Sequence, residues 1–185
     1  MTTFTLFDDS NAPEASKSLL AKSKQNFGMI PNLHAVMAAS PQLLEGYQKL
    51  HELFAQSGFS NDELTVVWQT INVEHRCHYC VPAHTGIAKQ MEVDDGLIDA
   101  LRNEEIVGDS KLEALRQFTL ALVRGRGEVS QDQLEKFYGA GYEQKHVLMI
   151  ILGVAQKVMS NYTNHIAQTP LDKPFDKFSW TPQEN

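Results

Sequence analysis

The segment 60–91 constrains the fold of this chain more than any other part of its 185 residues. Ser60 and Glu63 have the spacing of a capping box, which starts a helix. The helix that follows, as far as Arg76, is apolar on more than one side, so we expect it at the centre of the protein. Pro82 fits only the first turn of a helix, because proline has no N–H group. We therefore expect two helices, the second beginning between positions 77 and 81.

The turn between these two helices contains the chain's only two cysteines, Cys77 and Cys80. We expect both at the start of the second helix, where free N–H groups and the helix dipole stabilise a thiolate. His84 follows Cys80 by one helical turn on the same face, so it can accept the Cys80 proton directly or through a water. Two thiols at this spacing can also close a disulfide, so one can resolve a sulfenic acid on the other. The helix start by itself allows either thiol to be the attacking one.

Three other interpretations compete with thiol redox chemistry. The cysteines could be buried and inert, because free cysteine is among the most buried residue types. A zinc site could use Cys77, Cys80 and His84 with His75 or His78, although its ligands would be crowded. Attachment of c-type haem requires histidine directly after the second cysteine, where this chain has valine, so haem is excluded. We expect no bound metal or cofactor.

The overall charge limits the partners. The net charge is −7 and the isoelectric point is about 5.4, whereas nucleic acids and anionic membranes are bound by basic surfaces. The N-terminus has no basic segment followed by a long apolar one, so we expect no secretory signal. The longest apolar run, 147–155, is too short to span a bilayer. Two cysteines are too few for a secreted disulfide scaffold, and we expect a cytoplasmic protein.

The rest of the chain is predicted to be helical. Apolar residues at helical spacing, with serine, aspartate, glycine and proline at the ends, predict these further helices: 12–27, 33–39, 41–58, 94–101, 110–124, 130–138 and 143–166. We find no convincing strand and no linker. The expected fold is all-α, one domain over residues 1–185, a helical bundle of about eight helices. An extended arm of about 170–185 follows, and we expect a neighbouring subunit to bury its Phe175, Phe178 and Trp180.

Two other segments bear on the site. Glu74 ends the central helix near the cysteines, where a carboxylate can orient His84 or pass protons, unless it is simply a solvated helix end. The last helix is apolar over 147–152, which we expect to be buried all round. Its later polar side chains are expected to line the active-site cavity, or else to form a subunit contact or an internal hydrogen-bond network: Asn161, Thr163, Asn164 and His165.

The segment 60–91 resembles the core of the carboxymuconolactone decarboxylase superfamily, in its alkylhydroperoxidase-D-like (AhpD-like) branch. The residues that carry the resemblance are Glu74-x-x-Cys77-x-Tyr79-Cys80-x-x-Ala83-His84. Flanking matches extend it over most of residues 26–170: Gly28-x-Ile30-Pro31-Asn32-Leu33, Ser40-Pro41, Leu112-x-Ala114-Leu115 and Gly139-x-Gly141-Tyr142.

The resemblance implies an all-α protein that assembles as trimers or hexamers and reduces hydroperoxides. It implies that Cys80 attacks the peroxide, that Cys77 resolves the sulfenic acid and that His84 accepts the proton. An external dithiol, lipoylated or of the thioredoxin type, would then reduce the disulfide. The chain departs from the family pattern in two places: Thr65 stands where a relay glutamate is expected, and Tyr79 replaces a histidine. The Tyr79 hydroxyl can still donate a hydrogen bond to the thiolate or the peroxide. A protein-disulfide reductase, or a redox-sensing or metal-binding module, is the alternative.

Overall fold

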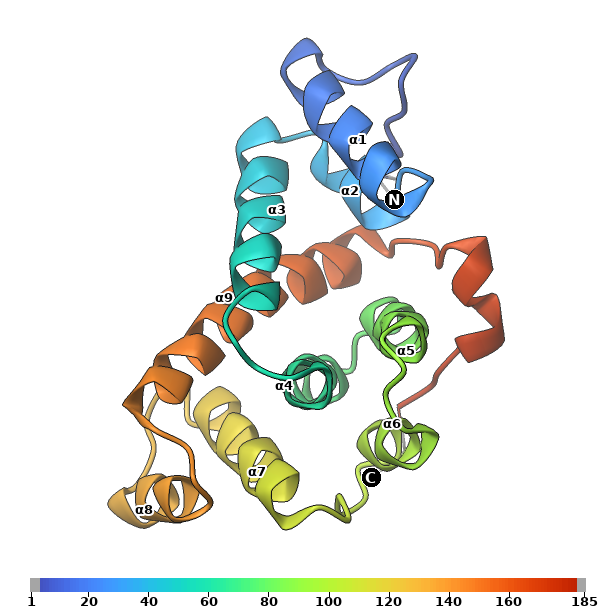
Figure 1. The fold of residues 1–185 in the computed structure, drawn as a ribbon. Helices are drawn as coiled ribbons and strands as arrows, with labels where there is room; N and C mark the ends of the chain where they lie inside the picture. Colours follow the sequence, from blue (N-terminus) through green and yellow to red (C-terminus); the bar gives the residue numbers. More distant parts are fainter. Residues whose placement is uncertain (1–3, 183–185) are drawn as a thin grey trace.

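Helix α4 (Asn61–Glu74) lies at the centre of the structure, and helices α5, α6, α7 and α9 pack against it. Figure 1 shows α4 and α5 end-on, side by side, in the computed structural model, which describes residues 4–182. The remaining elements are α1 (Glu14–Phe27), α2 (Asn32–Met37), α3 (Pro41–Ala55), α5 (Cys80–Gln90), α6 (Asp95–Arg102), α7 (Ser110–Arg124), α8 (Gln131–Gly139), α9 (Gln144–Ala167) and the 3-10 helix η1 (Lys173–Phe178). No strand occurs within 4–182, so the prediction of an all-α fold is confirmed.

The helix starts follow the capping signals of the sequence. The Ser60 hydroxyl accepts the N–H of Glu63, whose carboxylate accepts the N–H of Ser60, as a capping box requires. Ser130 and Gln133 form a second box at α8, and Asp94 caps α6. These local contacts place the helix boundaries close to those predicted.

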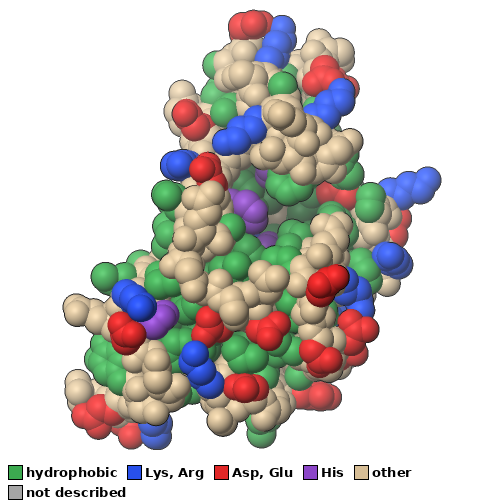
Figure 2. All heavy atoms as spheres, viewed as in Figure 1, with side chains coloured by type: hydrophobic (Ala, Val, Ile, Leu, Met, Phe, Trp, Pro, Cys, Tyr) green, Lys and Arg blue, Asp and Glu red, His purple; other side chains and the backbone are tan. Residues whose placement is uncertain are grey.

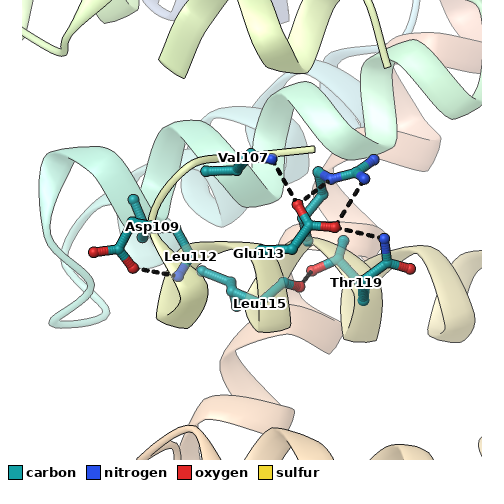
Figure 3. A network of polar contacts seen from close by, with 8 residues as sticks. Val107, Asp109, Leu112, Glu113, Leu115 and Thr119 are labelled. Atoms are coloured by element: carbon teal, nitrogen blue, oxygen red, sulfur yellow. Dashed lines mark hydrogen bonds and ion pairs between the residues drawn. The ribbon is translucent and has the colours of Figure 1, made fainter. Parts of the chain in front are cut away.

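The connection between α6 and α7 is held by two carboxylates, which Figure 3 shows. Asp109 accepts the N–H of Leu112 and so caps α7. Glu113 accepts the N–H of Val107 from the loop and two N–H groups of Arg116 from the next turn. The loop is therefore tied to the helix that packs against α4.

The buried apolar side chains form two clusters. The larger surrounds α4 and draws on α6, α7, α8 and α9. The smaller joins α1, α2 and α3 to the turn before α5, and it contains Cys77, Tyr79 and Cys80. The cysteines therefore lie where the N-terminal helices meet the central pair.

The C-terminal arm differs from the prediction. Residues 173–178 form η1, whereas we expected the whole arm to be extended, and η1 packs on α5. Phe175 lies against Gly86, where an added Cβ would come within 2.7 Å of the ring. The indole N–H of Trp180 donates to the carbonyl of Arg102. The aromatic side chains of the arm are therefore half-buried by their own chain. This removes our reason to expect that a neighbouring subunit buries them. The oligomeric state itself stays a prediction.

Helix α9 is less buried than predicted. Leu148 is 61% exposed and Ile151 is 48% exposed, so the segment 147–152 is not buried all round. Only one side of α9 packs against α3 and α4. No helix within the described part of the chain is long and apolar enough to cross a membrane.

Candidate active site

The two thiols lie on either side of a helix start. Cys80 is the first residue of α5, whereas Cys77 lies one turn before it. We expected both cysteines at the helix start, but only Cys80 is there. The N–H of Cys80 donates to the sulfur of Cys77 at 3.2 Å. Both cysteines are free, and their side chains are buried. The local geometry thus brings the two sulfurs together without a bond between them.

Electrostatics distinguish the two thiols. Burial raises the pKa of Cys80, but the hydrogen bond from Cys77, the charge of Lys157 and the amide of Asn164 outweigh it and lower this pKa to about 5. The hydrogen bond to Cys80, together with burial, raises the pKa of Cys77 far above its ordinary value. At neutral pH the pair is therefore a Cys80 thiolate that accepts a hydrogen bond from a Cys77 thiol.

Three polar residues of α9 face the thiols. Lys157, Asn161 and Asn164 are spaced by four and three residues, so they share one side of the helix, and all are fully buried. The Asn164 amide donates to the Cys80 sulfur at 3.2 Å. The Asn161 amide donates to Asn72 of α4 at 3.0 Å. Of the polar residues predicted here, the two asparagines lie at the thiols, as part of an internal hydrogen-bond network.

Lys157 joins the thiols to His84. Its Nζ lies 2.9 Å from Nε2 of His84, and it is fully buried. Burial, the charge of Lys157 and His51 hold the pKa of His84 well below its ordinary value, so the ring is neutral. Lys157 donates to Nε2, which leaves the ring hydrogen on Nδ1. Nδ1 is buried and has no hydrogen-bond partner within residues 4–182.

A cavity of about 870 Å³ opens beside Cys80 and His84. Its lining includes Lys157 but not Cys77, so only one of the two thiols faces it. Figure 2 shows the hollow, with histidine side chains along it. Its volume is within the range of about 300–1,000 Å³ typical of small-molecule sites. The cavity is therefore large enough for a substrate well beyond the size of hydrogen peroxide.

One wall of the cavity is a continuous row of rings. Neighbouring ring centres are 5.0–6.3 Å apart along the series Phe27, His34, Tyr47, His51, Trp68 and His84. Burial is the main cause that lowers the pKa of His34 to about 3 and that of His51 to about 4. These imidazoles are therefore neutral near pH 7, and the wall suits an aromatic or apolar group.

Tyr79 holds the C-terminal arm against the motif. Its hydroxyl donates to the carboxylate of Asp172 and accepts the N–H of Leu33. Asp172 also accepts the N–H of Asn32 at 3.0 Å. The hydroxyl proton of Tyr79 is thus donated to Asp172, although the Tyr79 ring lines the cavity. The structure therefore gives the Tyr79 hydroxyl a positioning contact, whereas the sequence suggested that it donates a hydrogen bond to the thiolate or the peroxide.

Glu74 is not brought to the thiols. Its two carboxylate oxygens accept hydrogen bonds from Arg124 of α7 at 2.9 and 2.8 Å. It lines a separate, smaller cavity that includes neither cysteine. The carboxylate is at the end of the helix, as expected, but the packing of α7 on α4 directs it away from His84.

The proposed zinc ligands have other partners. His75 pairs with Asn161 at 2.8 Å, and His78 pairs with the carbonyl of Thr169 at 3.0 Å. Within residues 4–182 no group of three or more histidine, cysteine, aspartate or glutamate side chains is arranged to hold a metal ion.

Lys157 and Asp172 were missed by the sequence analysis. A signal for Lys157 existed: it follows the apolar run 147–155 within the same predicted helix, at the spacing that aligns it with Asn161 and Asn164. No comparable signal marks Asp172, because it lies near the chain end and outside the helices that apolar spacing predicts.

The comparisons with known proteins bear on the fold. An uncharacterised peroxidase-related protein with an AhpD core from Ralstonia eutropha JMP134 matches with a TM-score of 0.79 and 17% identity, over 95% of this chain and 96% of that one. A peroxidase-related protein from Silicibacter sp. TM1040 matches with a TM-score of 0.79 and 17% identity, over 94% and 95%. The debrominase Bmp8, in complex with 2,3,4-tribromopyrrole, matches with a TM-score of 0.79 and 15% identity, over 96% and 95%.

By sequence alone, no protein-family model and no curated protein matches the chain. The likeness in structure extends over almost the whole chain and shows the fold: it is the AhpD-like fold, as the sequence resemblance implied. The comparisons thus define a class of helical folds that includes peroxidase-related proteins and a debrominase.

Proposed function

We infer that the protein is a cysteine-dependent peroxidase that reduces organic hydroperoxides. The observation that carries this proposal is the arrangement of the thiols: Cys80 faces the large cavity, and Cys77 lies behind it within hydrogen-bond reach. The lowered pKa of Cys80 makes it a thiolate, which is the nucleophilic form. Its polar neighbours keep that charge stable in a buried site.

In the proposed cycle, the Cys80 thiolate attacks one oxygen of the peroxide. An S–O bond forms, the O–O bond breaks, and an alcohol and a Cys80 sulfenic acid result. The Cys77 thiol then attacks the sulfur of Cys80, which gives a disulfide and releases water. An external dithiol reduces the disulfide and restores both thiols. His84, next to Cys80 along the cavity, takes part in the proton transfers.

The first experiment is a stopped-flow reaction of the reduced protein with excess cumene hydroperoxide, followed by mass spectrometry. We expect each chain to lose two hydrogens within seconds and to yield a linked peptide pair containing Cys77 and Cys80. A Cys77→Ser, Cys80→Ser double variant is the control, which should consume no peroxide. Thiols that stay intact for minutes would refute the proposal.

A second candidate is the reductive debromination of aromatic rings. The row of rings along the cavity favours it, because a flat halogenated ring would pack well there. The thiolate would take the bromine, the ring carbon would take a proton, and Cys77 would displace bromide to form the disulfide. Bromide release from 2,3,4-tribromopyrrole, with no reaction of cumene hydroperoxide, would favour this candidate over the first.

A further inference from the structure

The contact between Lys157 and His84 is unusual for two basic side chains. A buried lysine normally pairs with a carboxylate, because an isolated buried charge is very unfavourable. Here Nζ of Lys157 bonds a neutral imidazole at 2.9 Å, and the negative group that acts on it is the Cys80 thiolate. The thiolate therefore serves as the counter-ion of the lysine.

The second observation is the free donor of His84. With Nε2 occupied by Lys157, the hydrogen lies on Nδ1, which is buried and unpartnered within the described residues. His84 is 6% exposed and lines the cavity beside Cys80. A buried N–H without a partner costs free energy, so its presence on a residue that lines the cavity points to a ligand that accepts a hydrogen bond there.

We propose that Lys157 and His84 form a proton relay that returns the Cys80 proton to the oxygen leaving the peroxide. The proposal rests on the peroxidase function inferred above and names a step within it. His84 donates from Nδ1 to the leaving oxygen, and its Nε2 takes a proton from Lys157. Lys157 acts through His84 and is therefore a positioning residue that also holds the proton.

The step balances in charge and protons. The thiolate forms an S–O bond with one peroxide oxygen, the O–O bond breaks, and the departing alkoxide becomes an alcohol with the His84 proton. Lys157 ends neutral, as does the Cys80 sulfenic acid. When the external dithiol later reduces the disulfide, its two protons go to Cys77 and Lys157, and Cys80 is again a thiolate.

The electrostatics explain why the lysine gives up its proton at this moment. Burial lowers the pKa of Lys157, and the charge of the Cys80 thiolate raises it. Once the thiolate has reacted, that negative charge is gone, so the buried ammonium is destabilised.

The other titratable groups around the relay are His51 and Tyr47 of α3. His51 is neutral near pH 7, since burial and Lys157 lower its pKa to about 4. Burial raises the pKa of Tyr47, so this side chain is neutral as well.

The test compares two oxidants whose leaving groups differ. Cumene hydroperoxide releases a strongly basic alkoxide, which needs a proton, whereas peracetic acid releases acetate, which does not. The ratio of the two single-turnover rates cancels any change in the fraction of Cys80 thiolate. We expect Lys157→Met to lower this ratio by about 100-fold, the scale of general acid catalysis. Lys145→Met, an exposed lysine on the same helix, is the matched control and should leave the ratio unchanged.

Lys157→Arg is the second variant. Arginine keeps a buried positive charge but does not release a proton in proteins, so the thiolate should persist while the rate ratio still falls. This variant decides the question if Lys157→Met fails to fold. The relay would be overturned if the rate ratio of the folded variant stayed within about threefold of the native ratio while the native protein reacted with both oxidants. The peroxidase function would then still stand. Native protein that reacts with neither oxidant would overturn both.

Discussion

Replacement of Asn164 by leucine tests how the protein stabilises the Cys80 thiolate. The Asn164 amide lies 3.2 Å from the Cys80 sulfur and 4.0 Å from the Cys77 sulfur. Leucine has a similar size but no N–H group. A hydrogen bond to a charged group contributes about 1.5–3 kcal/mol, and one pKa unit corresponds to about 1.4 kcal/mol. The pKa of Cys80, about 5 in the native protein, should therefore rise by about 1–2 units.

The sign of the effect on activity follows from the thiolate fraction. For a rise of about 1.5 units, this fraction falls about eightfold at pH 5.5 but only by about a tenth at pH 7.5. The single-turnover rate with cumene hydroperoxide should show the same pattern. We would measure it from pH 4.5 to 8.5, together with the rate of Cys80 alkylation by iodoacetamide. Both profiles should shift to higher pH by the same amount.

The control for this prediction is Thr163→Val on the same helix. The Thr163 hydroxyl donates to the carbonyl of Met159 and does not touch the thiols, so its loss should leave the profile in place. A midpoint for Asn164→Leu within about 0.3 units of the native one, in a folded variant, would show that the amide does not stabilise the thiolate. Our account of the charge distribution at the site would then be wrong.

Three further outcomes are expected. Cys80→Ser should abolish the reaction with peroxide, whereas Cys77→Ser should react once and stop at a sulfenic acid that dimedone traps; the reverse pattern would exchange the two roles. Glu74→Gln should change the peroxide rate less than about twofold and the free energy of unfolding by at most about 1 kcal/mol, because its ion pair is at the surface and away from the cavity; a large loss of rate would return Glu74 to the proton pathway. Asp172→Ala should lower the free energy of unfolding by about 1–3 kcal/mol in urea titrations, since Tyr79 would lose its hydrogen-bond acceptor; unchanged stability would show that this contact is not what holds the arm.

The C-terminal arm illustrates a limit of sequence patterns. Its aromatic residues indicated burial, and burial occurs, but against α5 and α6 of the same chain. A pattern of apolar residues says that a surface must be covered and does not say by what. Leu148 and Ile151 of α9 are the opposite case. They belong to an apolar run that predicted burial, but within this chain they stay exposed.

The sequence by itself determined the helices, their starts and the position of Cys80 at the beginning of α5. These features depend on short-range causes, namely capping side chains, proline at a first turn and apolar spacing, which act within a few residues. The tertiary structure decided which groups surround the thiols. Lys157 and Asn164 are more than 70 residues from the cysteines in the chain, and Arg124 holds Glu74 away from them. Such contacts arise from the way α9 and α7 pack on α4 and α5. A local pattern could mark Asn164 as a polar position on its helix, but it could not specify which atoms that side chain meets.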